Sequence, residues 1–231
     1  MTLASFKATR QPLLGQVVKS FDHNLSFESA TVKDDSGADG RTDEVGTVYG
    51  AVLFGAPVGA VVVGASAGGG TGDGTLDDIA LKAGAQLGVY TLECITEATN
   101  AGVFAVFDPN GNRLEDATVG VAYDNGQIAF EISDGDADFD LGDAFSITVP
   151  EGSGQMLPID FSAVDGSQRF AAICGERTTV AAAGTQRAKV LKRLANVTTE
   201  KLIWPAGATS GQKAQAIKEA NAAFIFTRTG V

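Results

Sequence analysis

Few side chains in this chain of 231 residues stand in a pattern that suggests catalysis. His23 is its only histidine, so a metal site built from several histidines is excluded, and a histidine-based catalytic triad would have to use this single residue in the polar end of the N-terminal segment. Ser167 follows Asp165 and Gly166 in a segment that superficially resembles a nucleophile motif, but no base is available to activate its hydroxyl group. We therefore interpret His23 as a solvated or packing residue and Ser167 as part of a turn. We expect no catalytic residue and no enzymatic activity.

A series of aspartates suggests calcium binding at first sight: Asp134, Asp136, Asp138, Asp140 and Asp143. An EF-hand loop that starts at Asp134 has Phe139 at its sixth position, where the turn requires glycine. Its twelfth position is Phe145, where the loop requires a bidentate glutamate. We therefore predict a turn followed by a strand edge whose carboxylates face water, and we expect no metal site.

The glycine-rich segment 68–74 has the composition of a phosphate-binding loop. It lacks the following Lys-Ser or Lys-Thr pair and the strand-to-helix context that such a loop requires. We predict a flexible linker there, and we expect the protein to bind no cofactor.

Acidic residues are concentrated in residues 72–150, which hold 15 acidic side chains and two basic ones, Lys82 and Arg113. The formal charge of this segment is −13, whereas residues 1–71 carry −2 and residues 151–231 carry +4, for a total of −11. A strongly acidic surface repels nucleic acid and keeps crowded proteins soluble. We therefore expect no nucleic-acid partner, and we interpret the change of charge as a domain boundary.

The composition is typical of an all-β protein, because glycine is abundant, proline is scarce and short apolar runs alternate with Gly, Asp and Asn clusters. No run approaches the roughly 20 apolar residues of a membrane span, and the first residues lack the pattern of a secretory signal. We therefore expect no membrane partner, and we expect the chain to be made and folded in a cytoplasm. Cys94 and Cys174 fall at alternating positions of two predicted strands, so we expect both to be buried free thiols.

Short strand patterns and turn sequences alternate between residues 76 and 149. The predicted strands are 78–82, 88–96, 103–108, 115–123, 128–133 and 144–149. Asn110-Gly111 and Asn125-Gly126 stand between alternating apolar residues and are strong hairpin signals. Strands at this spacing predict a small immunoglobulin-like β-sandwich, which we place at residues 66–150.

The C-terminal segment predicts a strand, a short helix and a last strand. Pro205 ends the first of these strands at Trp204, because proline has no amide hydrogen for a sheet ladder. Thr209 and Gln212 have the spacing of a capping box, which marks the start of a helix. We place the helix at 213–221 and the last strand at 224–227.

This order of elements resembles the end of the bacteriophage lambda head decoration protein family, in which a strand runs into a Trp-Pro step before a small helix and a last apolar strand. The segment Gly46–Gly50, with the sequence GTVYG, is similar to a Gly-Thr-Val-x-Gly segment of that family. The resemblance implies a mainly β fold, with a decoration-like body that contains one short helix. We assign this body to residues 31–65 and 151–231, interrupted by the sandwich as an inserted domain.

The resemblance also implies a structural function, because proteins of this family sit on the outside of phage capsids. We expect a homotrimer that binds the major capsid protein on the outer surface of the expanded head and stabilises the head against DNA pressure. Trp204 and Pro205 are expected to pack in the body or at the trimer interface. The alternative is a virion surface module whose sandwich recognises a host carbohydrate or receptor, although the sandwich offers few aromatic residues for a sugar platform.

Residues 1–30 hold scattered apolar side chains without a sustained period, and we interpret them as an extended arm. Such an arm can add as a strand to the sheet edge of a capsid subunit. Its first basic residues precede any acidic residue and give a local charge of +3, which suggests an acidic rim on the partner. A frayed terminus without function is the alternative. The residues assigned to capsid binding are Leu3, Phe6, Lys7, Arg10, Leu13, Leu14, Val17 and Val18.

Overall fold

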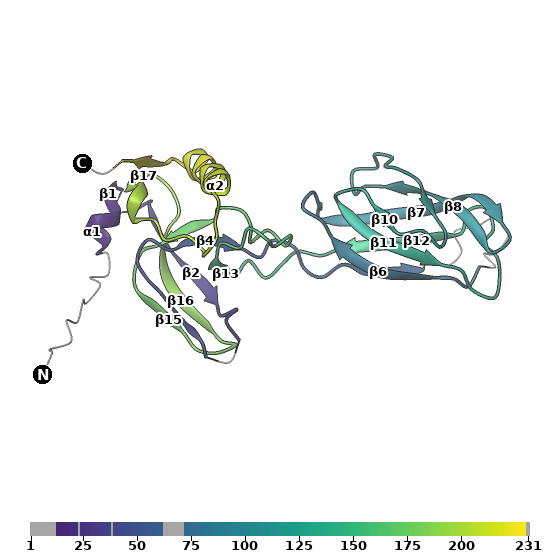
Figure 1. Ribbon diagram of the computed structural model, residues 1–231, viewed down its shortest axis with the longest axis horizontal. Helices are drawn as coiled ribbons and strands as arrows, with labels where there is room; N and C mark the ends of the chain where they lie inside the picture. The colour runs from purple at the N-terminus through teal and green to yellow at the C-terminus, as the bar shows by residue number, and fades with distance from the viewer. Residues whose placement is uncertain (1–12, 23, 38, 62–71, 230–231) are drawn as a thin grey trace, which may run out of the picture. The chain divides into compact units, whose positions relative to one another are not determined.

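The computed structural model describes residues 13–22, 24–37, 39–61 and 72–229, and it shows two compact units (Figure 1). One unit, here called the body, comprises residues 1–52 and 154–231. The other unit, here called the sandwich, comprises residues 53–153, so parts of the body precede and follow it in the chain. Both units are built mainly from β-strands, as the sequence predicted.

The body is built around a closed five-stranded barrel. In spatial order its strands are β13 (Met156–Pro158), β2 (Phe27–Lys33), β16 (Thr185–Leu191), β14 (Ala172–Cys174) and β4 (Val48–Ala51). A separate antiparallel ribbon is formed by β3 (Arg41–Asp43) and β15 (Thr178–Val180). Val32, Tyr49 and Val190 are fully buried inside the barrel. Closure of the barrel leaves these five strands without a free sheet edge.

Two close contacts explain the sequence around β4. A Cβ atom at Gly50 would lie 1.9 Å from the carbonyl oxygen of Ser167, so only glycine fits there. The hydroxyl group of Tyr49 donates a hydrogen bond of 2.8 Å to Asp43, whose carboxylate also pairs with Arg41. Burial raises the pKa of the Tyr49 hydroxyl group, so the group stays protonated and remains a hydrogen-bond donor.

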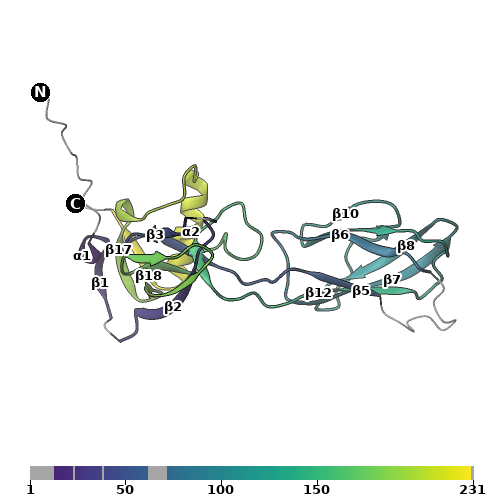
Figure 2. The same ribbon diagram turned by 90° about the horizontal axis from the view of Figure 1, so that it is seen from below.

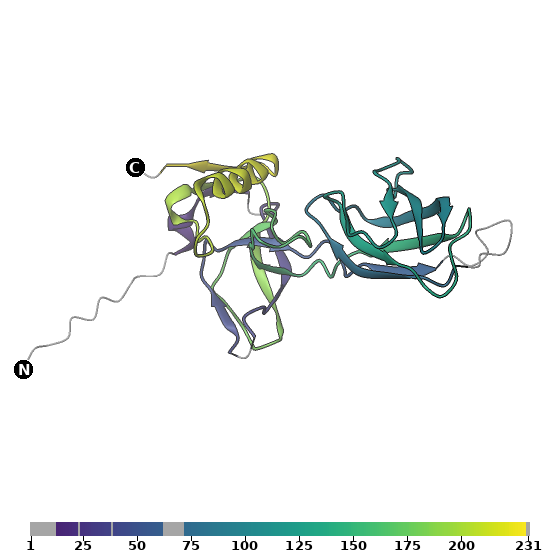
Figure 3. The same ribbon diagram turned by 45° about the vertical axis from the view of Figure 1, so that its right-hand side comes forward.

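A three-stranded sheet and two α-helices complete the body. The strands are β1 (Val18–Phe21), β17 (Ala195–Thr198) and β18 (Ile225–Arg228), in that spatial order (Figure 2). The helix α1 (Leu14–Val17) precedes β1, the 3-10 helix η1 (Thr199–Lys201) follows β17, and α2 (Ser210–Ala222) precedes β18. Figure 3 shows α2, in yellow, beside the last strand, which it contacts.

The predicted capping box at the start of α2 is confirmed. Thr209 Oγ1 accepts a hydrogen bond of 3.3 Å from the amide of Gln212, and Gln212 Oε1 accepts one of 2.9 Å from the amide of Thr209. Ala216 and Ala220 are the buried residues of the helix, and their small side chains allow it to approach the body closely. A helix of 13 residues is marginal in isolation, so this packing supplies much of its stability.

The described part of the predicted arm differs from the extended conformation that we expected for residues 1–30. Val17 and Val18 are 0% and 5% exposed and belong to the core of the body. β1 pairs antiparallel with β17, and β2 is a strand of the barrel. The apolar residues of this segment lack a sustained period because one helical turn passes directly into a strand.

The sandwich consists of two sheets that share one core. The larger sheet contains, in spatial order, β5 (Val58–Val61), β12 (Ala144–Val149), β7 (Gly88–Ala98), β8 (Ala101–Phe107) and β9 (Ala117–Thr118). The smaller sheet contains β10 (Tyr123–Asp124), β11 (Ile128–Ser133) and β6 (Thr75–Leu81). The predicted strand 115–123 is thus two short strands, β9 and β10. The sandwich begins before residue 66, where its start was predicted, because β5 pairs with β12.

Buried residues alternate with partly or fully exposed ones along β7, β11 and β12, as expected for strands with one face in a core. The rings of Phe104, Phe139 and Phe145 pack against one another at the centre of this core, with centroid separations of 5.1 to 5.8 Å. Edge-to-face and tilted contacts of this kind add stabilisation beyond the buried area.

The chain leaves and re-enters the body at two adjacent positions. The amide of Val52 donates a hydrogen bond of 3.0 Å to the carbonyl oxygen of Gln155, and the amide of Gly154 donates one of 2.9 Å to that of Val52. Within the sandwich, the amide of Gly152 donates a bond of 2.8 Å to Leu53. The two ends of the sandwich segment are therefore held together by backbone pairing.

Both cysteines are buried free thiols, as predicted, and Cys94 and Cys174 are 2% and 1% exposed. Burial raises the pKa of each thiol above its ordinary value, which lowers the fraction of reactive thiolate. We predict that neither thiol in the folded protein reacts with a pyridyl disulfide reagent at mildly alkaline pH, and that both react promptly after unfolding. Rapid labelling of one thiol in the folded protein, counted by absorbance, would contradict the buried placement.

Candidate interaction surfaces

The residues assigned to a capsid-binding arm fall into three groups. Leu3, Phe6, Lys7 and Arg10 lie outside the described residues, as does His23. Leu13 is 70% exposed, whereas Leu14 is partly buried and packs against the core of the body. Val17 and Val18 are buried in that core, so they hold the start of the described chain to the body and are not free to contact a partner.

Trp204 is partly buried and packs against the core of the body, and Pro205, also partly buried, follows it in the chain. The backbone of the preceding residue fixes their position, because the amide of Ile203 bonds to the carbonyl of Gly46 at 2.9 Å. The partly buried Trp204 ring stacks on Phe161, with centroids 6.4 Å apart and planes inclined by 24°. Beside them is a cavity of about 220 Å³ with these lining residues: Thr42, Asp43, Glu44, Thr47, Val48, Pro158, Ile203, Trp204 and Pro205.

Ser167 lies in a turn, as predicted, and is not poised as a nucleophile. Its hydroxyl group donates a hydrogen bond of 2.5 Å to Asp165 Oδ1, which also accepts the Ser167 amide at 3.0 Å. Ser167 is 1% exposed, and Gly50 approaches its carbonyl closely. The serine and the aspartate therefore stabilise the turn that packs against β4.

Two of the aspartates that suggested calcium, Asp138 and Asp143, accept hydrogen bonds from backbone amides. Asp143 Oδ2 accepts hydrogen bonds from the amides of Gly72 and Asp140, at 3.2 and 2.9 Å. Asp138 Oδ1 accepts one of 2.7 Å from the amide of Asn100. Asp143 is buried, so it does not face water as we expected. Among the described residues, no three His, Cys, Asp or Glu side chains are grouped so as to hold a metal ion.

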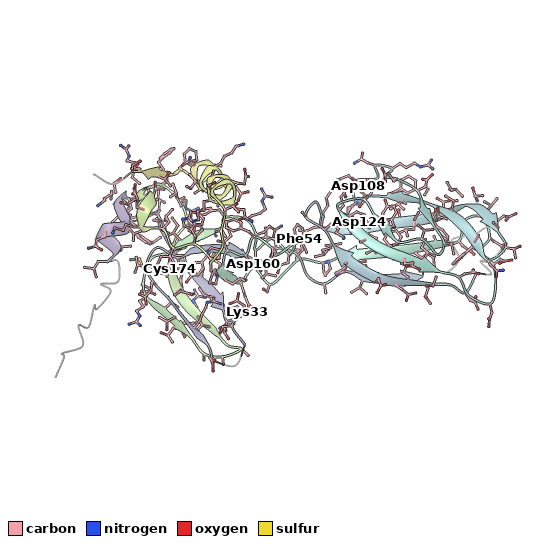
Figure 4. The ribbon with its side chains drawn as sticks, viewed as in Figure 1. Lys33, Phe54, Asp108, Asp124, Asp160 and Cys174 are labelled. Carbon is pink, nitrogen blue, oxygen red and sulfur yellow. The ribbon has the colours of Figure 1, made fainter. Side chains whose placement is uncertain are left out.

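Two further carboxylates stabilise hairpin turns of the sandwich (Figure 4). Asp108 accepts hydrogen bonds from the amides of Asn110 and Asn112, and the Asn112 side chain lowers the pKa of Asp108. Asp124 pairs with Lys82 at 2.6 Å, and this partner lowers the pKa of Asp124. Both carboxylates are therefore ionised at neutral pH and hold the loops that the Asn-Gly pairs predicted.

The two units have opposite formal charges. The body contains 15 basic and 12 acidic residues, for a charge of +3. The sandwich contains two basic and 16 acidic residues, for a charge of −14. In the described part of the chain, no helix is long and apolar enough to cross a membrane.

An exposed apolar cluster on the body was not predicted. We call it the apolar patch, and its members are Leu25, Leu194, Phe224 and Phe226, which are 52%, 39%, 60% and 49% exposed. The sequence contained one signal for it. Phe224, Ile225 and Phe226 are consecutive, so a strand there must present large apolar side chains on both faces, and Ile225 is the buried one.

Comparison with known proteins gives one match to a family. The model of the family described as bacteriophage lambda head decoration protein D matches residues 8–225. No curated protein matches the chain. Two crystal structures of Xanthomonas campestris FlgL, in space groups H3 and C2, match with 18% identity and TM-scores of 0.31 and 0.30. They cover 53% and 52% of this chain, which spans 39% and 35% of the FlgL chains, and similarity this low carries no argument.

The family match covers most of the body and the whole sandwich, and it defines the chain as a structural protein of phage heads. The chain belongs to the bacteriophage lambda head decoration protein D family. Its role is therefore capsid decoration, its partner is the phage capsid and its location is the virion. The family resemblance is confirmed. The strand that we predicted up to Trp204 is wrong, because this segment forms the 3-10 helix η1 and then a single bridge from Ile203 to Thr47.

The stacked pair of Trp204 and Phe161 generates a stability prediction. Trp204→Ala is expected to lower the free energy of unfolding by about 2–3 kcal/mol, less than for a fully buried tryptophan because the ring is partly exposed. Urea denaturation measures this loss. A double-mutant cycle with Phe161→Ala is expected to give a coupling of about 0.5–1.5 kcal/mol.

The matched control for Trp204 is Ile203→Ala, which removes an adjacent side chain that is 37% exposed. We expect the control to change stability by less than about 1 kcal/mol. Light scattering coupled to size exclusion reports the oligomeric state of each variant. An unchanged unfolding curve and an unchanged oligomer for Trp204→Ala would show that the tryptophan packs neither in the body nor between subunits.

Proposed function

We propose that this protein is a homotrimeric cement protein that binds the outer surface of the expanded phage head and stabilises the head against the pressure of packaged DNA. The observation that carries the proposal is the match to the head decoration family over residues 8–225. The partner is the major capsid protein, and the protein is made in the bacterial cytoplasm before it joins the virion. The first test is co-sedimentation. We expect the protein to sediment with expanded heads and not with unexpanded heads.

In this proposal the N-terminal segment has two parts. Residues 1–12 form a capsid-binding arm, and residues 13–21 form an anchor that joins the arm to the body. Burial of Val17 and Val18 and the pairing of β1 with β17 attach residues 13–21 to the body. Residues 1–12, which include Leu3, Phe6, Lys7 and Arg10, supply the contact by adding to a sheet edge of a capsid subunit. Repetition of this contact across a trimer and a lattice multiplies its strength through effective concentration.

The sandwich is, in this proposal, an insertion into the decoration fold that covers the head with negative charge. Its charge of −14 opposes aggregation of closely spaced copies and binding to nucleic acid. The insertion is supported by the backbone pairing of Val52 with Gly154 and Gln155, which leaves the body continuous without the sandwich.

A second candidate function is recognition of a host carbohydrate or receptor by the sandwich. The observation that favours it is an open, polar hollow of about 530 Å³ lined by Arg113, Leu114, Glu115, Asp124, Asn125 and Gln127. No aromatic ring lines this hollow, and sugar sites commonly use one, so head decoration is the stronger candidate. Loss of host adsorption after removal of the sandwich, with head binding retained, would favour this second function.

Removal of the sandwich tests its independence. We replace residues 53–153 with Asn-Gly, a pair that favours tight hairpin turns between strands. Because Val52 already bonds to Gln155, the shortened chain is expected to fold with an unchanged oligomeric state. Its affinity for expanded heads is expected to change less than tenfold, or about 1.4 kcal/mol.

A control deletion of residues 53–158 also removes β13, and its barrel is expected not to form because one of five strands is missing. Circular dichroism and head co-sedimentation are measured for both deletions. An unfolded product from the shorter deletion, together with a folded isolated sandwich, would contradict the division into an independent body and an inserted unit.

Deletion of Thr2 to Pro12 tests the arm while leaving the anchor in place. We expect the melting temperature and the oligomeric state to stay unchanged, because Val17 and Val18 remain buried. Affinity for expanded heads is expected to fall at least tenfold, about 1.4 kcal/mol, in a sedimentation titration.

Charge in the arm is tested with matched substitutions. Lys7→Ala with Arg10→Ala is expected to weaken head binding at low salt and to make it less sensitive to salt. The control, Lys213→Ala with Lys218→Ala, removes the same charge from α2 and is expected to leave binding unchanged. Full binding by the arm deletion would show that the folded body carries the whole contact.

A further inference from the structure

The apolar patch is assembled from three segments by hydrogen bonds. The hydroxyl group of Ser26 donates to the carbonyl of Leu194 at 2.8 Å, and Arg193 Nε donates to the carbonyl of Leu25 at 2.9 Å. The amide of Ala195 donates to the carbonyl of Phe224 at 3.1 Å. Two side-chain bonds and one backbone bond therefore hold together three segments that are distant in the sequence.

Phe226 lies on the face of the three-stranded sheet that points away from the core. Its register partner Asn196 donates a hydrogen bond of 2.7 Å to Ser20 and accepts one of 3.0 Å from Arg228, so all of these side chains share the outer face. In the described part of the chain, β18 has a strand neighbour on one side only, which is β17. The patch therefore adjoins an open sheet edge, which is a ready acceptor for another strand.

Two residues of the patch are held in an unfavourable backbone conformation. Leu194 and Phe224 have φ angles of 51° and 59°, in the left-handed region that favours glycine and asparagine. Large apolar residues at such positions reduce stability, and exposure of their side chains adds no compensating burial. Strain of this kind concentrates at sites of function.

Basic groups outnumber acidic groups next to the patch, and they are Lys192, Arg193 and Arg228 against Asp22 and Glu28. Glu28 pairs with both Lys192 and Arg193, and Asp22 Oδ1 accepts the amides of Asn24 and Leu25. The rim is therefore positive, which favours a partner with acidic groups around an apolar centre. The protein's own residues 1–12 carry Lys7 and Arg10 and no acid, so the rim repels them.

The location of the patch indicates the same partner. Residues 1–12, which the proposed function assigns to the capsid, lead through Leu13 and α1 into β1. β1 and β18 are the two outer strands of one sheet (Figure 2). A contact made through the chain before Leu13 therefore brings a capsid subunit toward the sheet that carries the patch.

We propose that the apolar patch and the open edge of β18 form a second capsid contact, which receives an apolar segment flanked by carboxylates from the shell subunit. This inference rests on the proposed function. The strained backbone at Leu194 and Phe224 keeps two apolar side chains available for that contact.

The experiment measures binding of the full-length protein to expanded heads. Phe226→Ser removes an exposed apolar side chain, and Leu141→Ser is its control in the sandwich, where Leu141 is 55% exposed. We expect Phe226→Ser to weaken head binding at least tenfold with an unchanged oligomeric state, and the control to bind like the wild type. Arg228→Glu is expected to weaken binding most at low salt.

Phe224→Asn is the second variant, because asparagine tolerates the left-handed conformation at φ 59°. We expect its melting temperature to be equal to or higher than that of the wild type while its head binding is at least tenfold weaker. That combination would not result from general damage to the fold. It therefore supports the docking role even if Phe226→Ser folds poorly.

Three outcomes would overturn the inference. If both variants bind heads as well as the wild type and have normal stability, the patch is not a capsid contact, and the proposed function is unaffected. A changed oligomeric state, or salt-sensitive self-association lost in Phe226→Ser, would make the patch an interface between copies, with the acidic sandwich as one partner. Failure of the wild-type protein itself to bind heads would instead overturn the proposed function on which the inference rests.

Discussion

The barrel of the body closes only when β4 pairs with β13, although the entire sandwich lies between them in the sequence. Ala51 pairs with Met156 and Gly50 with Leu157, and the bond from Val52 to Gln155 continues this ladder to the boundary. A disordered connection of this length would raise the entropy cost of closing the barrel. A folded sandwich with adjacent ends avoids much of that cost, as would a tight turn. The stability of the body therefore depends on the distance between the two ends of the segment that joins β4 to β13 more than on the fold of that segment.

The polar side chains that suggested chemistry instead determine the conformation of loops. Asp34, which is 3% exposed, accepts bonds from Ser36 and from the amide of Ala183, and the Ser36 hydroxyl group lowers the pKa of Asp34. Asp108 and Asp143 serve two loops of the sandwich in the same way. Unpaired buried amides destabilise a fold, so a turn-rich β protein needs such acceptors. In this chain carboxylates accordingly support the loops, whereas the contacts that we propose with the capsid use exposed apolar groups.

Local signals predicted the elements whose own residues determine them. Strands 128–133 and 144–149 have the predicted bounds, because apolar and polar residues alternate strongly there. The capping box at Thr209 correctly predicted the start of α2. β1 and β2 were missed within the segment 1–30, because their existence depends on β17 and β16, which are distant in the sequence. β5 was missed because its strand neighbour among the described residues, β12, is distant in the sequence. The apolar patch required the same long-range pairing, since Phe224 meets residue 195 only in the folded sheet.

Under the proposed function, the three-stranded sheet transmits load between the capsid contact and the body. Tension on the chain before Leu13 passes through α1 into β1, whose antiparallel ladder joins Val18 to Val197 and Phe21 to Ala195. Ladder bonds lie across the strands, so tension along β1 loads several bonds together instead of one at a time. Burial of Val17 and Val18 adds the cost of exposing a packed core to any extraction of this strand. β18 lies in the same sheet, so a capsid contact at its edge raises the effective concentration of the contact made by the chain before Leu13. When one of these two contacts dissociates, the other keeps the partners close enough for it to form again.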